Sequence, residues 1–110
     1  MVIKNNRISK KKDFDYIFKK GKNISGVLLI LKFIKNNLGN NRFAFIINKK
    51  VSSKAIVRNK IRRRISETVK IFKNNENGLD IVFIALPAIR DKNFIEIKEE
   101  VNTLLSKIGF

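Results

Sequence analysis

The segment AIVRNKIRRRISE, residues 55–67, concentrates side chains that bind phosphate. Five of the seven positions from 58 to 64 are basic, namely Arg58, Lys60, Arg62, Arg63 and Arg64. A guanidinium group forms paired hydrogen bonds with phosphate oxygens and also stacks on nucleobases. A surface that neutralises several phosphates binds tightly and loses affinity as salt is added. The segment is therefore a candidate contact for nucleic acid.

Apolar residues interrupt this charge at helical spacing. They step by 4, 4, 4 and 3 positions through Val57, Ile61, Ile65, Val69 and Phe72. Such a stripe predicts a helix of about 20 residues with one face on a core. The other positions form three outward columns: Lys54, Arg58, Arg62, Ser66 and Lys70; Asn59, Arg63 and Glu67; Lys60 and Arg64. Within the second column, we expect Glu67 to pair with Arg63.

The charge of the whole chain favours the same partner. The net charge is +16, from 25 Lys and Arg against 9 Asp and Glu. Residues 1–35 carry a net +8 and residues 49–73 a net +9, whereas residues 74–110 carry −2. A run of basic residues is usually just a solvated surface, but two such blocks repel themselves unless a polyanion lies beside them. Nucleic acid is the favoured partner, and an anionic membrane is the second candidate.

Composition excludes several kinds of chemistry. The chain has no Cys, so it has no disulfide or thiolate ligand, and no His, the commonest general base. We expect no catalytic residue and no metal site in it. Its 110 residues are 44% hydrophobic, which fits one folded domain over residues 1–110. No signal-peptide pattern or apolar run of about 20 residues is present, so we expect a cytoplasmic protein without membrane partners.

Periodicity and turn residues predict an α+β fold. The segment VSS, residues 51–53, supplies a candidate serine N-cap for the basic helix. Asn93 and Glu96 resemble a capping box at the start of the last helix. The strand at 79–86 is nearly all apolar and should lie centrally in a sheet. The expected order is a helix at 9–21, a possible short strand near 23–26, a hairpin of strands 26–35 and 42–48, the basic helix, the strand at 79–86 and a final helix.

Residues 48–67, NKKVSSKAIVRNKIRRRISE, resemble the signature of the bacterial ribonuclease P protein subunit. That signature has a Lys-Lys pair, a short loop, and then Arg-Asn-Arg-x-Lys-Arg-x-x-Arg-Glu on a helix. Four residues match it, and these are Arg58, Asn59, Arg63 and Glu67. Lys60 and Arg62 exchange lysine and arginine, and Ser66 stands where the family has arginine. The first helix is also similar to the family's opening, through Asp13, Phe14, Phe18 and Gly21.

The resemblance implies a fold and a mechanism. The fold is an α-β-β-β-α-β-α two-layer sandwich with a left-handed β-α-β crossover, like the second domain of the fifth small-subunit ribosomal protein. The family's catalyst is an RNA subunit that uses Mg²⁺ to remove the 5′ leader from precursor tRNA. The protein subunit binds that RNA and the leader, and no obligate protein partner is expected. This chain would therefore be an enzyme subunit whose RNA partner, holding most of the Mg²⁺, carries the chemistry.

The resemblance also assigns two surfaces. The RNA subunit would contact Lys49, Lys50, Lys54, Arg58, Asn59, Lys60, Arg62, Arg63 and Arg64. The single-stranded leader would enter a cleft between the first helix and the sheet, where Lys11, Lys12, Phe14, Phe18 and Lys32 lie. Helical spacing alone leaves open whether Phe14 and Phe18 are core residues or stacking platforms. On the strand, either Lys32 and Ile30 or their neighbours face the core.

Three other functions are compatible with parts of this sequence. A ribosomal or other structural RNA-binding protein would share the charge and size, but it does not predict the Arg-Asn signature. A membrane-surface protein would present a more aromatic apolar face than the basic helix does. A protein-only nuclease would need a cluster of carboxylates, which the basic blocks lack.

Overall fold

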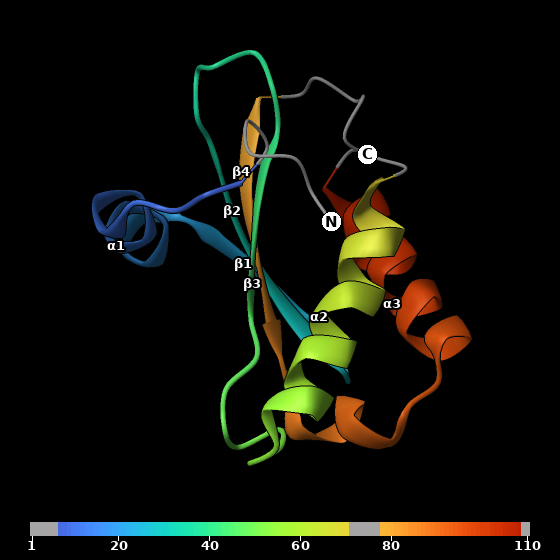
Figure 1. The fold of residues 1–110 in the computed structure, drawn as a ribbon. Coiled ribbons are helices and arrows are strands. Elements are labelled where there is room, and N and C mark those ends of the chain that lie inside the picture. Colours follow the sequence, from blue (N-terminus) through green and yellow to red (C-terminus); the bar gives the residue numbers. More distant parts are fainter. Residues whose placement is uncertain (1–6, 71–77, 109–110) are drawn as a thin grey trace.

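A computed structural model describes residues 7–70 and 78–108 of the chain. Its elements follow the predicted α-β-β-β-α-β-α order, with one short 3₁₀ helix added (Figure 1). They are α1 Lys11–Lys20, β1 Lys22–Ser25, β2 Leu29–Lys35, β3 Arg42–Ile46, α2 Ala55–Val69, β4 Leu79–Ala85, η3 Pro87–Asp91 and α3 Phe94–Lys107. The α+β class and the short strand before β2 are confirmed.

The predicted hairpin of β2 and β3 is wrong. The strand order is β1-β2-β4-β3, so β4 lies between β2 and β3. β2 pairs antiparallel with β4, whereas β3 pairs parallel with β4. The physical reason is that β4 is buried over most of its length, which favours an interior position with neighbours on both edges. The basic helix α2 forms the crossover between the parallel strands β3 and β4.

The two faces of the sheet are covered by different helices. In Figure 1, α2 and α3 pack together on one face and α1 lies on the other. The larger core lies under α2 and α3 and includes Phe43, Ile65, Phe83 and Val101. A smaller cluster lies under α1 and contains Ile8, Ile17, Ala44 and Val82, with half-buried Phe14, Ile34, Ile46 and Ile84 packed against it. One short helix cannot cover the whole of that face, so part of the apolar sheet surface faces solvent.

The apolar stripe of α2 is confirmed where the structure describes it. Ile61, Ile65 and Val69 are buried, Val57 is half-buried against the same core, and Phe72 lies outside the described residues. The predicted serine N-cap is wrong. Lys54 holds the N-cap position without a side-chain cap bond.

At the start of α3 the predicted capping box is present. The Asn93 side chain accepts a hydrogen bond from the backbone N–H of Glu96 at 2.9 Å, and the Glu96 carboxylate accepts one from the N–H of Asn93 at 3.5 Å. The predicted stripe of α3 also faces the core, with Ile97, Val101, Leu104 and Leu105 buried and Ile108 half-buried.

Candidate nucleic-acid interface

The basic helix α2 presents a graded cationic surface. Lys54, Asn59, Lys60 and Arg63 are exposed, whereas Arg58, Arg62 and Arg64 are half-buried. The exposure of each side chain depends on its angle from the buried stripe at Ile61 and Ile65. Positions beside the stripe are partly covered by the core, and positions opposite it face solvent. Asn59 and Arg63, opposite the stripe, point most directly to solvent.

The three half-buried arginines are held by hydrogen bonds. Arg58 Nη1 donates to the Ser52 carbonyl at 2.9 Å, Arg62 Nη1 to Asn59 Oδ1 at 2.7 Å, and Arg64 Nη1 to the Lys92 carbonyl at 3.0 Å. Each guanidinium has five N–H donors, so these bonds orient it and leave donors for phosphate. Arg64 also joins α2 to the segment that precedes α3. Pre-oriented arginines lose less side-chain entropy on binding than free ones.

Two details of the predicted outward columns are wrong. Ser66 is 1% exposed, so the first column turns into the core at this position. Ser66, which stands at the family's arginine position, therefore offers no side chain to the outer surface of α2. Glu67 accepts a hydrogen bond from Lys70 Nζ at 3.2 Å, where we had expected Arg63 as its partner. This bond with Lys70 lowers the pKa of Glu67.

The lysines that precede α2 extend the cationic surface beyond the helix. Lys49 and Lys50 are exposed in the loop between β3 and α2, at the end of the sheet where α2 begins (Figure 1). Asn48 shapes this loop, since its Oδ1 accepts a hydrogen bond from the Lys50 N–H at 2.9 Å. Together with Lys54 they place three exposed ammonium groups at the N-terminal end of the basic helix.

The structure separates the two phenylalanines of α1. Phe14 is half-buried and packs on the cluster of Ile17, Ala44 and Val82, so it is mainly a core residue. Phe18 is 42% exposed, and Lys32 Nζ lies 5.4 Å from the centroid of its ring. That distance is typical of a cation–π contact. An exposed ring beside an ammonium group offers a base a stacking surface and its phosphate a counter-charge.

The remaining cleft candidates lie nearby with different exposure. Lys32 is half-buried, and strand alternation places it on the α1 face of the sheet together with Ile30. Lys11 and Lys12 are exposed on α1, and Lys11 Nζ lies 3.4 Å from Asp15 Oδ2 in a solvent-exposed ion pair. Such pairs are weak and do not prevent a lysine from reaching phosphate.

Arg42 ties α1 to the sheet, a role that the sequence reasoning missed. Its Nε and Nη2 donate to the two carboxylate oxygens of Asp80 at 2.8 and 2.6 Å, and its Nη1 lies 3.5 Å from Asp13 Oδ2 on α1. The hydrogen bond with Asp80 raises the pKa of Arg42. Asn36 Nδ2 donates to Asp80 as well, at 2.9 Å. Asp80 is the one charged residue in the otherwise apolar strand β4, and a carboxylate in such a strand was the signal for a basic partner.

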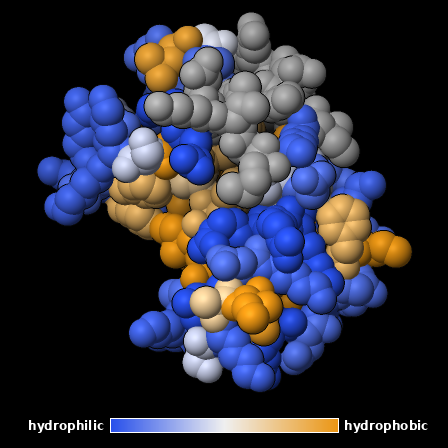
Figure 2. Space-filling model, in the orientation of Figure 1, coloured by the Kyte–Doolittle hydropathy of each residue, from blue (hydrophilic) through white to orange (hydrophobic). Residues whose placement is uncertain are grey.

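Apolar surface separates the two cationic regions. Figure 2 shows an orange to tan hollow between the hydrophilic surface of α1 on the left and that of α2. The half-buried residues Ile34, Ile46 and Ile84 belong to this face of the sheet. An apolar floor between two basic walls suits an unstacked single strand, because bases need apolar contact and phosphates need cations.

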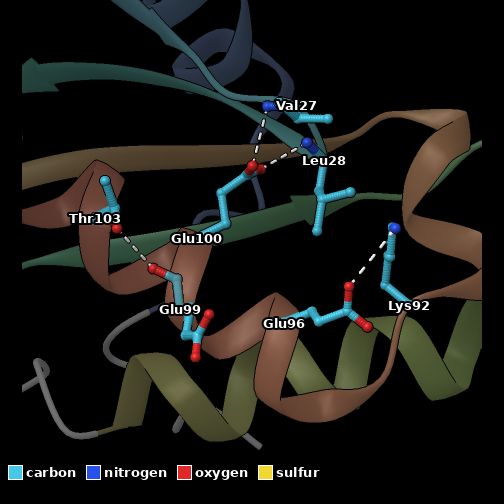
Figure 3. Close-up of a pocket in the computed structure, with 7 residues that line it drawn as sticks. All are labelled: Val27, Leu28, Lys92, Glu96, Glu99, Glu100 and Thr103. Atoms are coloured by element: carbon cyan, nitrogen blue, oxygen red, sulfur yellow. Dashed lines mark hydrogen bonds and ion pairs between the residues drawn. The ribbon is translucent and has the colours of Figure 1, made fainter.

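The acidic side chains of α3 lie on a different surface. A hollow of about 370 Å³ is lined by Glu96, Glu99 and Glu100 with Val27, Leu28, Lys92 and Thr103 (Figure 3). The Glu100 carboxylate accepts hydrogen bonds from the N–H groups of Val27 and Leu28, at 3.0 and 2.7 Å. These carboxylates would repel phosphate, so this hollow is a poor RNA site.

In the described part of the chain, no helix is both long and apolar enough to cross a membrane. Within the same ranges, 7–70 and 78–108, no group of three or more acidic side chains is placed to hold a metal ion.

Comparisons with known proteins agree on one family. Residues 2–109 match the family model described as Ribonuclease P. The chain is 38% identical over 109 residues to the ribonuclease P protein component of Clostridium botulinum strain 657, with 97% of each chain covered. It is 39% identical over 106 residues to that of Clostridium kluyveri, with 94% of each covered.

Solved structures give the same result for the fold. The ribonuclease P protein of Staphylococcus aureus superposes with a TM-score of 0.88 at 28% identity, covering 94% of this chain and 95% of that one. The protein from Thermotoga maritima superposes with a TM-score of 0.83 at 28% identity, covering 94% and 98%.

Proposed function

The chain belongs to the ribonuclease P protein family, and from this premise we propose that it binds a catalytic RNA subunit and the 5′ leader of precursor tRNA. As a protein component of ribonuclease P it acts in tRNA processing within a ribonucleoprotein. The finer proposal is that its two surfaces have different RNA partners. The observation that carries it is the pair of cationic regions, on α2 and beside α1, with apolar sheet surface between them.

The RNA subunit binds the α2 surface in this proposal. A folded RNA presents phosphates at fixed positions, which suits arginines that are already oriented by hydrogen bonds, as Arg58, Arg62 and Arg64 are. The exposed residues Asn59 and Arg63 then supply further contacts. Lys49, Lys50, Lys54 and Lys60 complete this surface.

The leader binds the cleft beside α1. Phe18 supplies the exposed ring and Lys32 the adjacent cation, with Lys11 and Lys12 on the outer side of the helix. Phe14 supports this site from below because it anchors α1 on the sheet. Arg42 acts in the same way, through its bonds to Asp80 and Asp13.

The chemistry belongs to the RNA subunit and its Mg²⁺ in this proposal, as the family resemblance implies. The part of the chain that the structure describes forms no acidic cluster suited to the ion, so no step is assigned to a metal held by this protein. The protein's contribution is positive charge and a fixed position for the leader. The positive charge reduces phosphate repulsion between substrate and RNA, and so lowers the Mg²⁺ concentration that cleavage needs. The place of action would be the cytoplasm.

The test is cleavage of a precursor tRNA by the cognate catalytic RNA at low Mg²⁺, with and without the protein. We expect correct 5′ cleavage only when the protein is added, and no cleavage by the protein alone. The variant R63A should weaken the rescue, whereas the matched control K98A, on α3, should not. Intact RNA binding without rescue would instead indicate a structural RNA-binding protein.

A further inference from the structure

The most exposed large apolar side chain among the described residues belongs to the basic helix. Ile56, in the first turn of α2, is 82% exposed. Ile65 of the buried stripe follows it after about two and a half turns, so the two side chains lie on opposite sides of the helix. A single exposed aliphatic side chain is common on protein surfaces and needs no function. The neighbours of Ile56 are what distinguish it.

Helical spacing places Ile56 on the face of α2 that carries the charge. Asn59, Lys60 and Arg63 follow it by three, four and seven positions, and all three are exposed. Residues at these separations share one side of a helix. From Ile56 to Arg63 the helix rises by only about 10 Å. Lys54, just before the helix, is exposed as well. A folded RNA that contacts residues before and after Ile56 therefore also covers Ile56.

An aliphatic side chain selects a different part of an RNA from a cation. It offers neither charge nor a hydrogen bond, so a phosphate would lose water there without compensation. Ribose C–H groups and base faces lose little on contact with it. A paired RNA helix keeps its base faces stacked and displays phosphates and 2′-hydroxyls, whereas unpaired segments expose their bases. Apolar side chains contact bases in this way where base steps are opened.

We propose that Ile56 packs against an unpaired nucleotide of the RNA subunit and makes the α2 surface selective for that RNA over a duplex of equal charge. The assignment rests on the function proposed above and adds specificity to it. The surrounding cations attract any polyanion, because phosphate contacts carry no sequence information. Ile56 adds a contact that needs a base or ribose exposed at this point. One apolar side chain among cations offers too little apolar surface for a membrane, and the charge favours RNA.

The first test compares I56A with V27A in binding to the catalytic RNA alone, without substrate. Val27 is the matched control, because it is 75% exposed but lines the acidic hollow on α3 (Figure 3). Both changes trim exposed side chains, so thermal melts should show both variants folded. We expect I56A to lose about tenfold in affinity for the catalytic RNA and less than twofold for a duplex RNA, and V27A to lose neither. The slope of log K against log salt should stay the same for I56A, whereas R63A should flatten it by about 0.7–0.9.

The second test adds a charge at the same position. If phosphate lies over Ile56, I56K should bind both RNAs more tightly by the same factor and steepen the salt dependence by about 0.7–0.9. If an unpaired nucleotide lies there, I56K should bind the duplex more tightly but the catalytic RNA no more tightly than the unmodified protein does.

Four results would overturn the proposal. They are an unchanged affinity of I56A for the catalytic RNA, an equal loss for catalytic and duplex RNA, an equal gain of I56K for both, and a loss for I56A that appears only when precursor tRNA is present. The last result would assign Ile56 to the substrate. Failure of the proposed function itself is distinguishable, since the unmodified protein would then not promote cleavage at low Mg²⁺.

Discussion

Replacing Arg42 with methionine tests the bond that joins α1 to the sheet. The change keeps much of the side-chain length but leaves the Asp80 carboxylate, 6% exposed, with Asn36 as a remaining hydrogen-bond donor. Removing one partner of a buried ion pair costs about 3–5 kcal/mol. Because the Arg42 side chain is 19% exposed and Asn36 remains, we expect a loss of about 2–4 kcal/mol in the free energy of unfolding. That is a large part of the ~5–15 kcal/mol typical of such domains, so the variant should fold but melt about 10–20 °C lower.

The measurement is urea unfolding followed by far-ultraviolet circular dichroism, since the chain has no Trp to report by fluorescence. The double variant R42M/D80N should recover most of the loss, because it removes the uncompensated charge as well as its partner. D13N should cost less than about 1 kcal/mol, since that contact is longer, at 3.5 Å, and more exposed. The reasoning is refuted if R42M loses less than about 1 kcal/mol, or if the double variant is no more stable than R42M.

Four further substitutions test other features of the structure. R63A should lower affinity for the RNA subunit and leave the melting temperature unchanged. R64A should lower both, because Arg64 also bonds to the segment before α3. RNA-binding and thermal-melting curves of the two variants give the comparison. S66A should raise stability by about 1 kcal/mol in a thermal melt, because the Ser66 hydroxyl is buried and has no hydrogen-bond partner among the described residues; a loss would mean that the hydroxyl is satisfied in solution. G21A should destabilise the protein by more than the ~1 kcal/mol of a typical substitution, since the added methyl group meets backbone at 2.5 Å; an unchanged urea midpoint would show that the end of α1 relaxes freely.

The position and orientation of the basic helix could be predicted from sequence. Its stripe at Ile61, Ile65 and Val69 has helical period, and burying that stripe forces Asn59 and Arg63 outward. The capping box of Asn93 and Glu96 was readable for a similar reason, since a cap depends on residues three positions apart. Features that depend on neighbours within a few residues are fixed by local backbone geometry, and a sequence pattern reports them directly.

The sequence did not decide whether Phe14 and Phe18 of α1 are core residues or exposed stacking surfaces. Spacing placed Phe14 and Phe18 on one side of a helix, but both the core and the cleft lie on that side. The structure separates them because α1 rests on only part of the sheet, so Phe14 packs inward while Phe18 reaches past the contact toward Lys32. How far a helix overlaps a sheet depends on the packing of both, which periodicity does not record.

The family, the basic helix and the absence of His and Cys chemistry follow from the residues alone. Packing of the whole chain was needed to show that β4 lies between β2 and β3, that Arg42 meets Asp80 across 38 positions of the chain, and that Ser66 is buried. Each of these outcomes depends on which strands become neighbours. The strand order places the most apolar strand, β4, where neighbouring strands and helices bury it on both edges and both faces. The free energy of that burial depends on all of these elements together, so no single segment of the sequence reports it.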